Sequence, residues 1–223
     1  MLIAGFPAGA FQTNCYVVAP AAGEECVIVD PGQDAVAGVD ELLREHRLKP
    51  VAVALTHGHL DHVWSVAPVC GARDIPAWIH PDDREMLSDP TKGIGAPIFG
   101  DLKLTEPDDV RELSDGAVLR LAGLELVVDH TPGHTRGSVS FRLPEDEIMF
   151  SGDLLFAGSI GRTDLPGGDY PTILRSLATK CLPLPDETVV LPGHGPQTTI
   201  GRERATNPYL KEAAPHAGPI RGM

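Results

Sequence analysis

The chain has little positive charge, only four cysteines and no long apolar run, and each of these shortages narrows the range of functions. Its 18 lysines and arginines are outnumbered by 31 aspartates and glutamates, which gives a formal net charge of −13. A chain this acidic repels a phosphate backbone, and no stripe of basic residues offsets the repulsion. The charge therefore argues against nucleic acid as a partner, while a small anionic substrate remains compatible with it.

The cysteines and the apolar segments indicate the compartment. None of the four cysteines forms a C-x-x-C pair, which argues against a cysteine-ligated zinc site. Met1 to Phe11 has no basic region and no cleavage-like signal follows it. No apolar run approaches the ~18 residues of a membrane helix. We expect a cytoplasmic protein with reduced, buried thiols and no membrane partner, whereas the oligomeric state stays open.

The chain length and the apolar pattern predict one domain, residues 1–223, that alternates strands and helices. A chain of 223 residues that is 42% hydrophobic can bury one sizeable core. Strands are expected at 14–19, 26–29, 51–55, 77–80, 117–121, 124–129, 138–143, 148–150 and 188–191. Helices are expected at 35–45, 63–69 and 170–182. Between Ser88 and Ser114 the pattern fails, which indicates either a loop over a pocket or a surface insertion.

The strongest motif is His57-Gly58-His59-Leu60-Asp61-His62, which comes directly after the expected strand 51–55. Imidazole and carboxylate together suit zinc, iron or manganese. Three histidines and one aspartate within six residues are more than one ion needs at this spacing. The motif therefore predicts a loop that supplies ligands to two adjacent divalent metal ions.

The remaining candidate ligands each follow an expected strand and lie beside glycine. They are His134 in Thr131–Thr135, Asp153 in Ser151–Asp153 and His194 in Pro192–Gly195. Glycine lets the backbone turn sharply and brings a side chain close to a crowded centre. Any one of them is an ordinary turn residue on its own, but the repeated setting favours ligands.

These segments, with Gly161-Arg162-Thr163-Asp164, resemble the metallo-β-lactamase superfamily, and within it the short glyoxalase II-like hydrolases, which are similar to hydroxyacylglutathione hydrolases. The resemblance covers residues 1 to about 200 and implies a four-layer αββα sandwich of two mixed sheets flanked by helices, an α/β (α+β) fold. It also implies that His57, His59 and His134 bind one metal ion, for which zinc is the first candidate. The second ion would take Asp61, His62 and His194, with Asp153 bridging the two.

A dinuclear centre of this kind suits thioester hydrolysis. Two adjacent cations lower the pKa of a bridging water toward about 7, which makes a hydroxide nucleophile at neutral pH. A thiolate leaves readily because the pKa of a thiol is ~8.5, so no strong general acid is needed. Asp61 is the candidate for orienting the hydroxide, and Arg162 the candidate for binding an anionic end of a small-molecule thioester. Asp30 is either a support for a ligand histidine or a turn cap.

The pattern departs from lactoylglutathione hydrolases at the C-terminus, where such enzymes carry a helical region that binds glutathione. Only 29 residues follow His194 here (223 − 194), and their prolines, including Pro208 and Pro215, do not suit a helical substrate domain. The thiol carrier is therefore left open. Class B β-lactamases resemble the chain less, because they commonly carry cysteine at the position of Asp153.

Three other functions compete with the thioesterase. A persulfide dioxygenase of the same superfamily, with a single iron held by two histidines and one aspartate, also contains Gly-Arg-Thr-Asp. A non-catalytic binding protein usually lacks a ligand, whereas all seven candidates are present. An RNA-cleaving member is disfavoured by the charge of −13.

Overall fold

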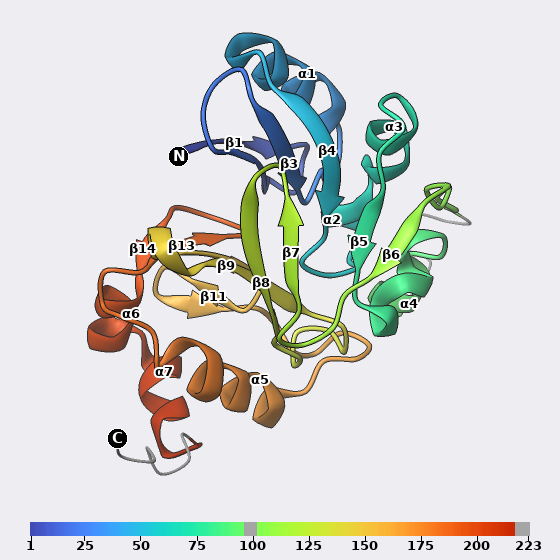
Figure 1. The fold of residues 1–223 in the computed structure, drawn as a ribbon. Coiled ribbons are helices and arrows are strands. Elements are labelled where there is room, and N and C mark those ends of the chain that lie inside the picture. Colours follow the sequence, from blue (N-terminus) through green and yellow to red (C-terminus); the bar gives the residue numbers. More distant parts are fainter. Residues whose placement is uncertain (96–101, 217–223) are drawn as a thin grey trace.

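The computed structural model describes residues 1–95 and 102–216, which form two six-stranded sheets packed face to face (Figure 1). Strand order in the first sheet is β1-β2-β3-β4-β5-β6, and in the second it is β14-β13-β10-β9-β8-β7. A short hairpin of β11 (Leu155–Phe156) and β12 (Ser159–Ile160) lies beside them. Each sheet is mixed, because antiparallel and parallel pairs occur in both.

The first sheet runs from antiparallel to parallel along the chain. Its first three strands pair antiparallel, and β3 to β6 pair parallel. The three parallel pairs require crossover connections, which contain α1, the α2–α3 segment, and η1 with α4. The elements are β1 (Leu2–Ala8), β2 (Thr13–Ala19), β3 (Glu25–Val29), α1 (Ala35–His46), β4 (Lys49–Ala54), α2 (Leu60–Val63), α3 (Val66–Gly71), β5 (Ala77–Ile79), η1 (Pro81–Leu87), α4 (Thr91–Ile94) and β6 (Val110–Glu112).

The second sheet is antiparallel except where β10 pairs parallel with β13. That one parallel pair is joined through α5 and η3, the helical segment between the two strands. The elements are β7 (Val118–Leu121), β8 (Leu124–His130), β9 (Val139–Leu143), η2 (Pro144–Asp146), β10 (Ile148–Gly152), α5 (Tyr170–Ser176), the π-helical turn η3 (Leu177–Cys181), β13 (Val189–Pro192), β14 (Thr198–Thr199), α6 (Ile200–Thr206), α7 (Pro208–Ala213) and η4 (Ala214–His216).

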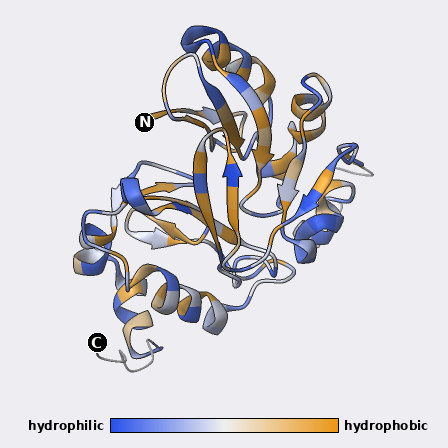
Figure 2. Cartoon of the chain, viewed as in Figure 1, coloured by the Kyte–Doolittle hydropathy of each residue, from blue (hydrophilic) through white to orange (hydrophobic). Residues whose placement is uncertain are grey.

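Three apolar clusters hold four layers together. The central cluster lies between the sheets and includes Val27, Val128, Phe141 and Phe150. The second packs α1 and α3 against the outer face of the first sheet, and the third packs α5, α6 and α7 against the second sheet. Figure 2 shows mostly apolar residues on the strands in the middle of the molecule, whereas the helices around them carry both apolar and polar residues. The order helix, sheet, sheet, helix confirms the predicted αββα sandwich.

The two-residue strands β11, β12 and β14 were not predicted, and two longer segments also differ from the sequence prediction. The stretch 88–114 contains the short helix α4 and the strand β6, so it is not irregular throughout, and its residues 96–101 lie outside the described part. The chain after His194 forms α6 and α7 despite its prolines. Pro208 is the first residue of α7, where its missing N–H and fixed φ are compatible with a helix. Leu210 and Ala213 of this helix belong to the third cluster.

The four cysteines, Cys15, Cys26, Cys70 and Cys181, are buried and unpaired, as expected. Within residues 1–95 and 102–216, no helix has the length and apolar character needed to cross a membrane.

Candidate metal centre

Seven predicted ligands converge because four segments that follow strands of the two sheets meet at one place. His57 and His59 follow β4 of the first sheet, and α2 begins inside the same motif, so Asp61 and His62 lie within its single turn. The other three ligands follow strands of the second sheet. These are His134 after β8, Asp153 after β10 and His194 after β13.

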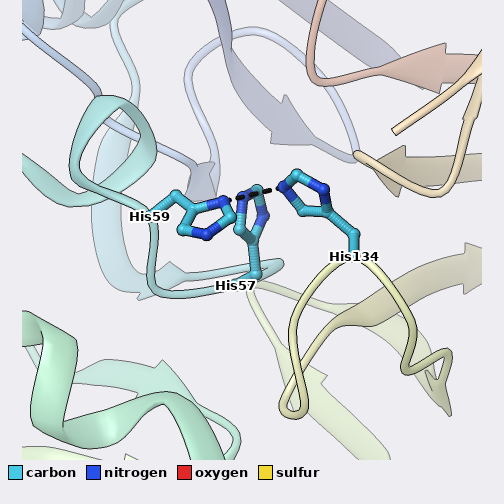
Figure 3. A group of neighbouring side chains, drawn as sticks. All are labelled: His57, His59 and His134. Carbon is cyan, nitrogen blue, oxygen red and sulfur yellow. Dashed lines mark hydrogen bonds between the residues drawn. The ribbon is translucent and has the colours of Figure 1, made fainter. Parts of the chain in front are cut away.

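The first group consists of His57, His59 and His134. One ligand atom from each lies within 4.8 Å of the other two. The ring centroids are 4.5 to 4.9 Å apart, and the ring planes meet at 82° to 89°. Figure 3 shows His59 and His134 facing each other beside His57, with 2.8 Å between His59 Nδ1 and His134 Nε2. Three imidazoles at these separations can share one cation.

The second group consists of Asp61, His62 and His194, whose ligand atoms also lie within 4.8 Å of one another. His194 Nε2 is 3.0 Å from Asp61 Oδ2, and His62 Nε2 is 3.5 Å from the same oxygen. Two imidazoles and a carboxylate form the donor set that zinc, iron and manganese accept.

The Asp153 carboxylate lies between the two groups. Its Oδ1 is 3.4 Å from His62 Nε2, and its Oδ2 is 3.4 Å from His134 Nε2 and 3.7 Å from His194 Nε2. One carboxylate therefore faces a histidine of the first group and two histidines of the second.

Unpaired polar atoms show that these residues fit metal ions. Buried side-chain nitrogens and oxygens nearly always have a hydrogen-bond partner. Among the described residues five such atoms have none, and three of them are free on ligands of the cluster: His57 Nε2, His62 Nε2 and Asp153 Oδ1. A fourth, His59 Nε2, lies on the far side of its ring from the Nδ1 that faces His134. A cation satisfies lone pairs that otherwise carry a desolvation cost, so the cluster is built to bind metal.

The electrostatics of the cluster favour cations as well. Burial lowers the pKa of His57 well below its usual value and that of His59 to about 3, so both rings are neutral and keep a free lone pair. Burial alone would raise the pKa of Asp61 and Asp153, but neighbouring histidines, His62 first, bring both below the usual value. Two carboxylates thus remain charged in a buried site.

The pKa of His62 reflects the negative electrostatic potential of the neighbouring carboxylates. Burial would lower its pKa, yet the carboxylates of Asp61, Asp153 and Asp30 outweigh burial and raise the pKa well above the usual value. The carboxylates therefore create a strongly negative potential at this ring, and that potential attracts a metal cation as it attracts a proton.

Neighbouring groups orient the ligands. Asp30 Oδ2 lies 2.9 Å from His62 Nδ1, and the backbone N–H and hydroxyl of Thr56 both donate to the same carboxylate. The carbonyl of Arg162 lies 2.7 Å from His134 Nδ1, and Thr13 Oγ1 donates to Asp61 Oδ2 at 2.9 Å. Of the two alternatives for Asp30, its contact with His62 favours the support for a ligand histidine. The sequence gives no signal for the others, because any residue carries a carbonyl and threonine hydroxyls are common.

Substitution Asp30→Asn is expected to weaken metal binding by about 10- to 100-fold, the usual cost of losing an outer partner of a ligand histidine. The amide cannot accept from both donors of Thr56 and also hold the His62 ring. Competition with a coloured chelator measures the affinity. Asp34→Asn, four residues later at the start of α1, is the control and should bind metal normally. Equal affinities of Asp30→Asn and the parent protein would contradict a supporting role.

The side chain of Arg162 points to a different partner from the one predicted. Its guanidinium pairs with Asp164, with Nε 2.7 Å from Oδ1 and Nη2 2.6 Å from Oδ2, and its side chain is 61% exposed. The backbone of this residue supports His134, as described above. Binding of a substrate anion by the Arg162 side chain stays a prediction.

A separate cluster away from these two groups, His80, Asp82 and His130, also places three ligand atoms within 4.8 Å. Its two rings stack in parallel, with centroids 4.2 Å apart. His80 Nδ1 accepts from the backbone N–H of Asp82 at the start of η1, and His130 Nε2 lies 2.8 Å from the carbonyl of Arg136. Both rings thus already contact the backbone, which suits a structural role.

Comparison with known proteins agrees with this geometry. The family model of the metallo-β-lactamase superfamily matches residues 8–194. A Haemophilus influenzae protein named hydroxyacylglutathione hydrolase GloC is 36% identical, over 92% of this chain and 95% of its own.

Two solved structures are also similar. The BLEG-1 B3 metallo-β-lactamase is 42% identical, with a TM-score of 0.85 over 94% of this chain and 99% of the other, so the expectation that class B β-lactamases resemble the chain less does not hold for this protein. The protein TTHA1623, solved in a di-iron-bound form, is 42% identical, with a TM-score of 0.79 over 92% of this chain and 99% of the other. With its sandwich fold and its histidine and aspartate cluster, the chain belongs to the metallo-β-lactamase superfamily and is a metal-dependent hydrolase.

Proposed function

We propose that the chain hydrolyses the thioester of a small thiol at a centre of two divalent metal ions. The position of Asp153 carries the proposal, because its two carboxylate oxygens face histidines of both groups. The similarity to a protein named hydroxyacylglutathione hydrolase supports a thioester substrate.

In this proposal each group holds one ion. His57, His59 and His134 would hold the first, Asp61, His62 and His194 the second, and Asp153 would contact both. When bound, such ions acidify a coordinated water and polarise a carbonyl. The donors are imidazole and carboxylate, so zinc, iron and manganese all fit. The di-iron form of the similar protein TTHA1623 makes iron as relevant as zinc in the assays.

The protein itself would orient the reactants. Thr13 and His194 both contact Asp61 Oδ2, which holds that oxygen in place. We assign Asp61 the role of accepting a hydrogen bond from the attacking water and so aligning it with the carbonyl carbon. The leaving thiolate needs no strong acid, because the pKa of a thiol is ~8.5.

A cysteine nucleophile does not fit the structure. Burial raises the pKa of Cys26, Cys70 and Cys181 to about 12, and it raises that of Cys15 as well. The reactive form of cysteine is the thiolate, which these residues do not provide at neutral pH. Unpaired, buried thiols also suit a reducing compartment, so a cytoplasmic location remains part of the proposal.

Substrate assays test the function directly, because GloC and BLEG-1 carry different activities in their names at comparable identity. Protein loaded separately with zinc, iron or manganese would be given S-lactoylglutathione, an acyl-coenzyme A, nitrocefin and glutathione persulfide. Thiol release from at least one thioester, abolished by a chelator and restored by metal, is the expected result. Oxygen uptake with the persulfide and no thiol release from any thioester would instead establish the dioxygenase. Cleavage of nitrocefin alone would establish a β-lactamase.

A further inference from the structure

A buried carboxylate that is not a candidate ligand lies between two loops of the metal centre. Asp83 belongs to η1, and it is fully buried although aspartate is rarely so. From the sequence it is simply an acidic residue at a helix start. Its burial requires partners that compensate the cost of removing a carboxylate from water.

Those partners come from both ligand loops. Asp83 Oδ2 accepts from the backbone N–H of Gly58 at 3.0 Å and from Thr135 Oγ1 at 2.6 Å, and its Oδ1 accepts from the backbone N–H of Gly137 at 2.8 Å. Gly58 lies between His57 and His59 in the sequence, and Thr135 directly follows His134. One side chain thus ties together the two loops that supply the first group of histidines.

The contacts leave little room for either loop to move. A Cβ atom on Gly58 would lie 2.8 Å from the carbonyl oxygen of Asp83, and one on Gly137 would lie 2.7 Å from its Cγ. Both loops therefore pack directly on Asp83. Beyond the Asp83 bridge, His59 Nδ1 and His134 Nε2 are 2.8 Å apart.

We infer that Asp83 is a positioning residue: it fixes the His57–His59 loop against the His134 loop and so sets the metal affinity of the first site. The inference rests on the proposed division of ligands between two ions but not on the thioester substrate. The second site has separate supports, because Asp30 orients His62 and Thr13 contacts Asp61. Loss of Asp83 should therefore weaken one site much more than the other.

Single-site backgrounds make this selectivity measurable. His194→Ala leaves the first group complete, and His134→Ala leaves the second complete. Asp83→Asn would be placed in each background and titrated with Co²⁺ against a chelator. In the His194→Ala background we expect affinity to fall about 10- to 100-fold, as for other outer partners of metal ligands. In the His134→Ala background it should stay close to the parent value.

Two further sets of variants separate positioning from general stability. Asp82→Asn is the matched control, since that neighbouring side chain is 55% exposed, and it should leave both sites unchanged. Thr135→Val removes one hydrogen bond to Asp83 with little change of volume, and it should weaken the first site even if Asp83→Asn does not fold. Thr135→Ser keeps the hydroxyl and should restore the affinity.

Equal weakening of both sites, or no weakening of the first, would overturn the inference. Thr135→Ser binding as weakly as Thr135→Val would overturn it too. A failure of the proposed function looks different: the parent protein would then bind fewer than two Co²⁺ ions, whatever the Asp83 variants do.

Discussion

Substitution Asp153→Ala is expected to reduce kcat/KM by more than about 100-fold, the upper range for losing a mere support of a metal ligand. The loss of Asp153 should lower kcat/KM further than that, because its carboxylate faces both groups of histidines. Without it, His62, His134 and His194 each lose the carboxylate that now lies 3.4 to 3.7 Å from a ring nitrogen. Elemental analysis of the purified variant should show the loss of one or both metal ions.

The control for this variant is Asp146→Ala. Asp146 is an exposed aspartate just before β10, the strand that Asp153 follows. Its replacement should leave metal content and turnover unchanged. A variant Asp153→Ala with normal metal content and normal turnover would end the bridging proposal.

The second large effect is expected from Gly193→Ala, although the substitution adds one methyl group to a residue that is not a ligand. The new Cβ would lie 2.7 Å from His62 Cε1 and would overlap Asp153 Oδ1. Gly193 belongs to buried backbone, since its N–H donates to the carbonyl of Gly152 and its carbonyl accepts from Asn14. The methyl group must therefore displace a ligand or the strand end, at a cost of about 1–3 kcal/mol for overpacking.

Metal affinity and thermal unfolding of Gly193→Ala would both be measured. We expect weaker binding at both sites and a lower melting temperature of the metal-loaded protein. Gly71→Ala is the control, because a Cβ there meets nothing within 4 Å. Alanine has a higher helix propensity than glycine, so this substitution should stabilise the last residue of α3 by up to about 1 kcal/mol. Normal metal binding by Gly193→Ala would contradict the close approach of Gly193 to Asp153 and His62.

The strands and the candidate ligands could be predicted because both leave local patterns in the sequence. The buried strands of both sheets are short runs of Val, Ile and Leu between turn residues, and such runs are recognisable without tertiary context. The candidate ligands follow these strands in motifs rich in histidine and glycine. The patterns therefore predicted alternating strands and helices and indicated seven residues that the structure brings together, while the αββα class came from the resemblance to the metallo-β-lactamase superfamily.

What the sequence did not predict depends on contacts between distant segments. β6 is three residues long and is defined by pairing with β5, so a local pattern cannot indicate it. The helices after His194 are stabilised by packing on α5 and η3 rather than by their own propensity. Asp83 is recognisable as a link between ligand loops only when Gly58 and Thr135 are placed beside it.

The central claim is that two metal ions lie on either side of Asp153. Anomalous diffraction from crystals of the metal-loaded protein, recorded at the absorption edge of the bound metal, tests it most directly. We expect two peaks per chain, each next to an Asp153 oxygen. One should lie among His57, His59 and His134, and the other among Asp61, His62 and His194. A single peak under saturating metal, or peaks away from Asp153, would contradict it.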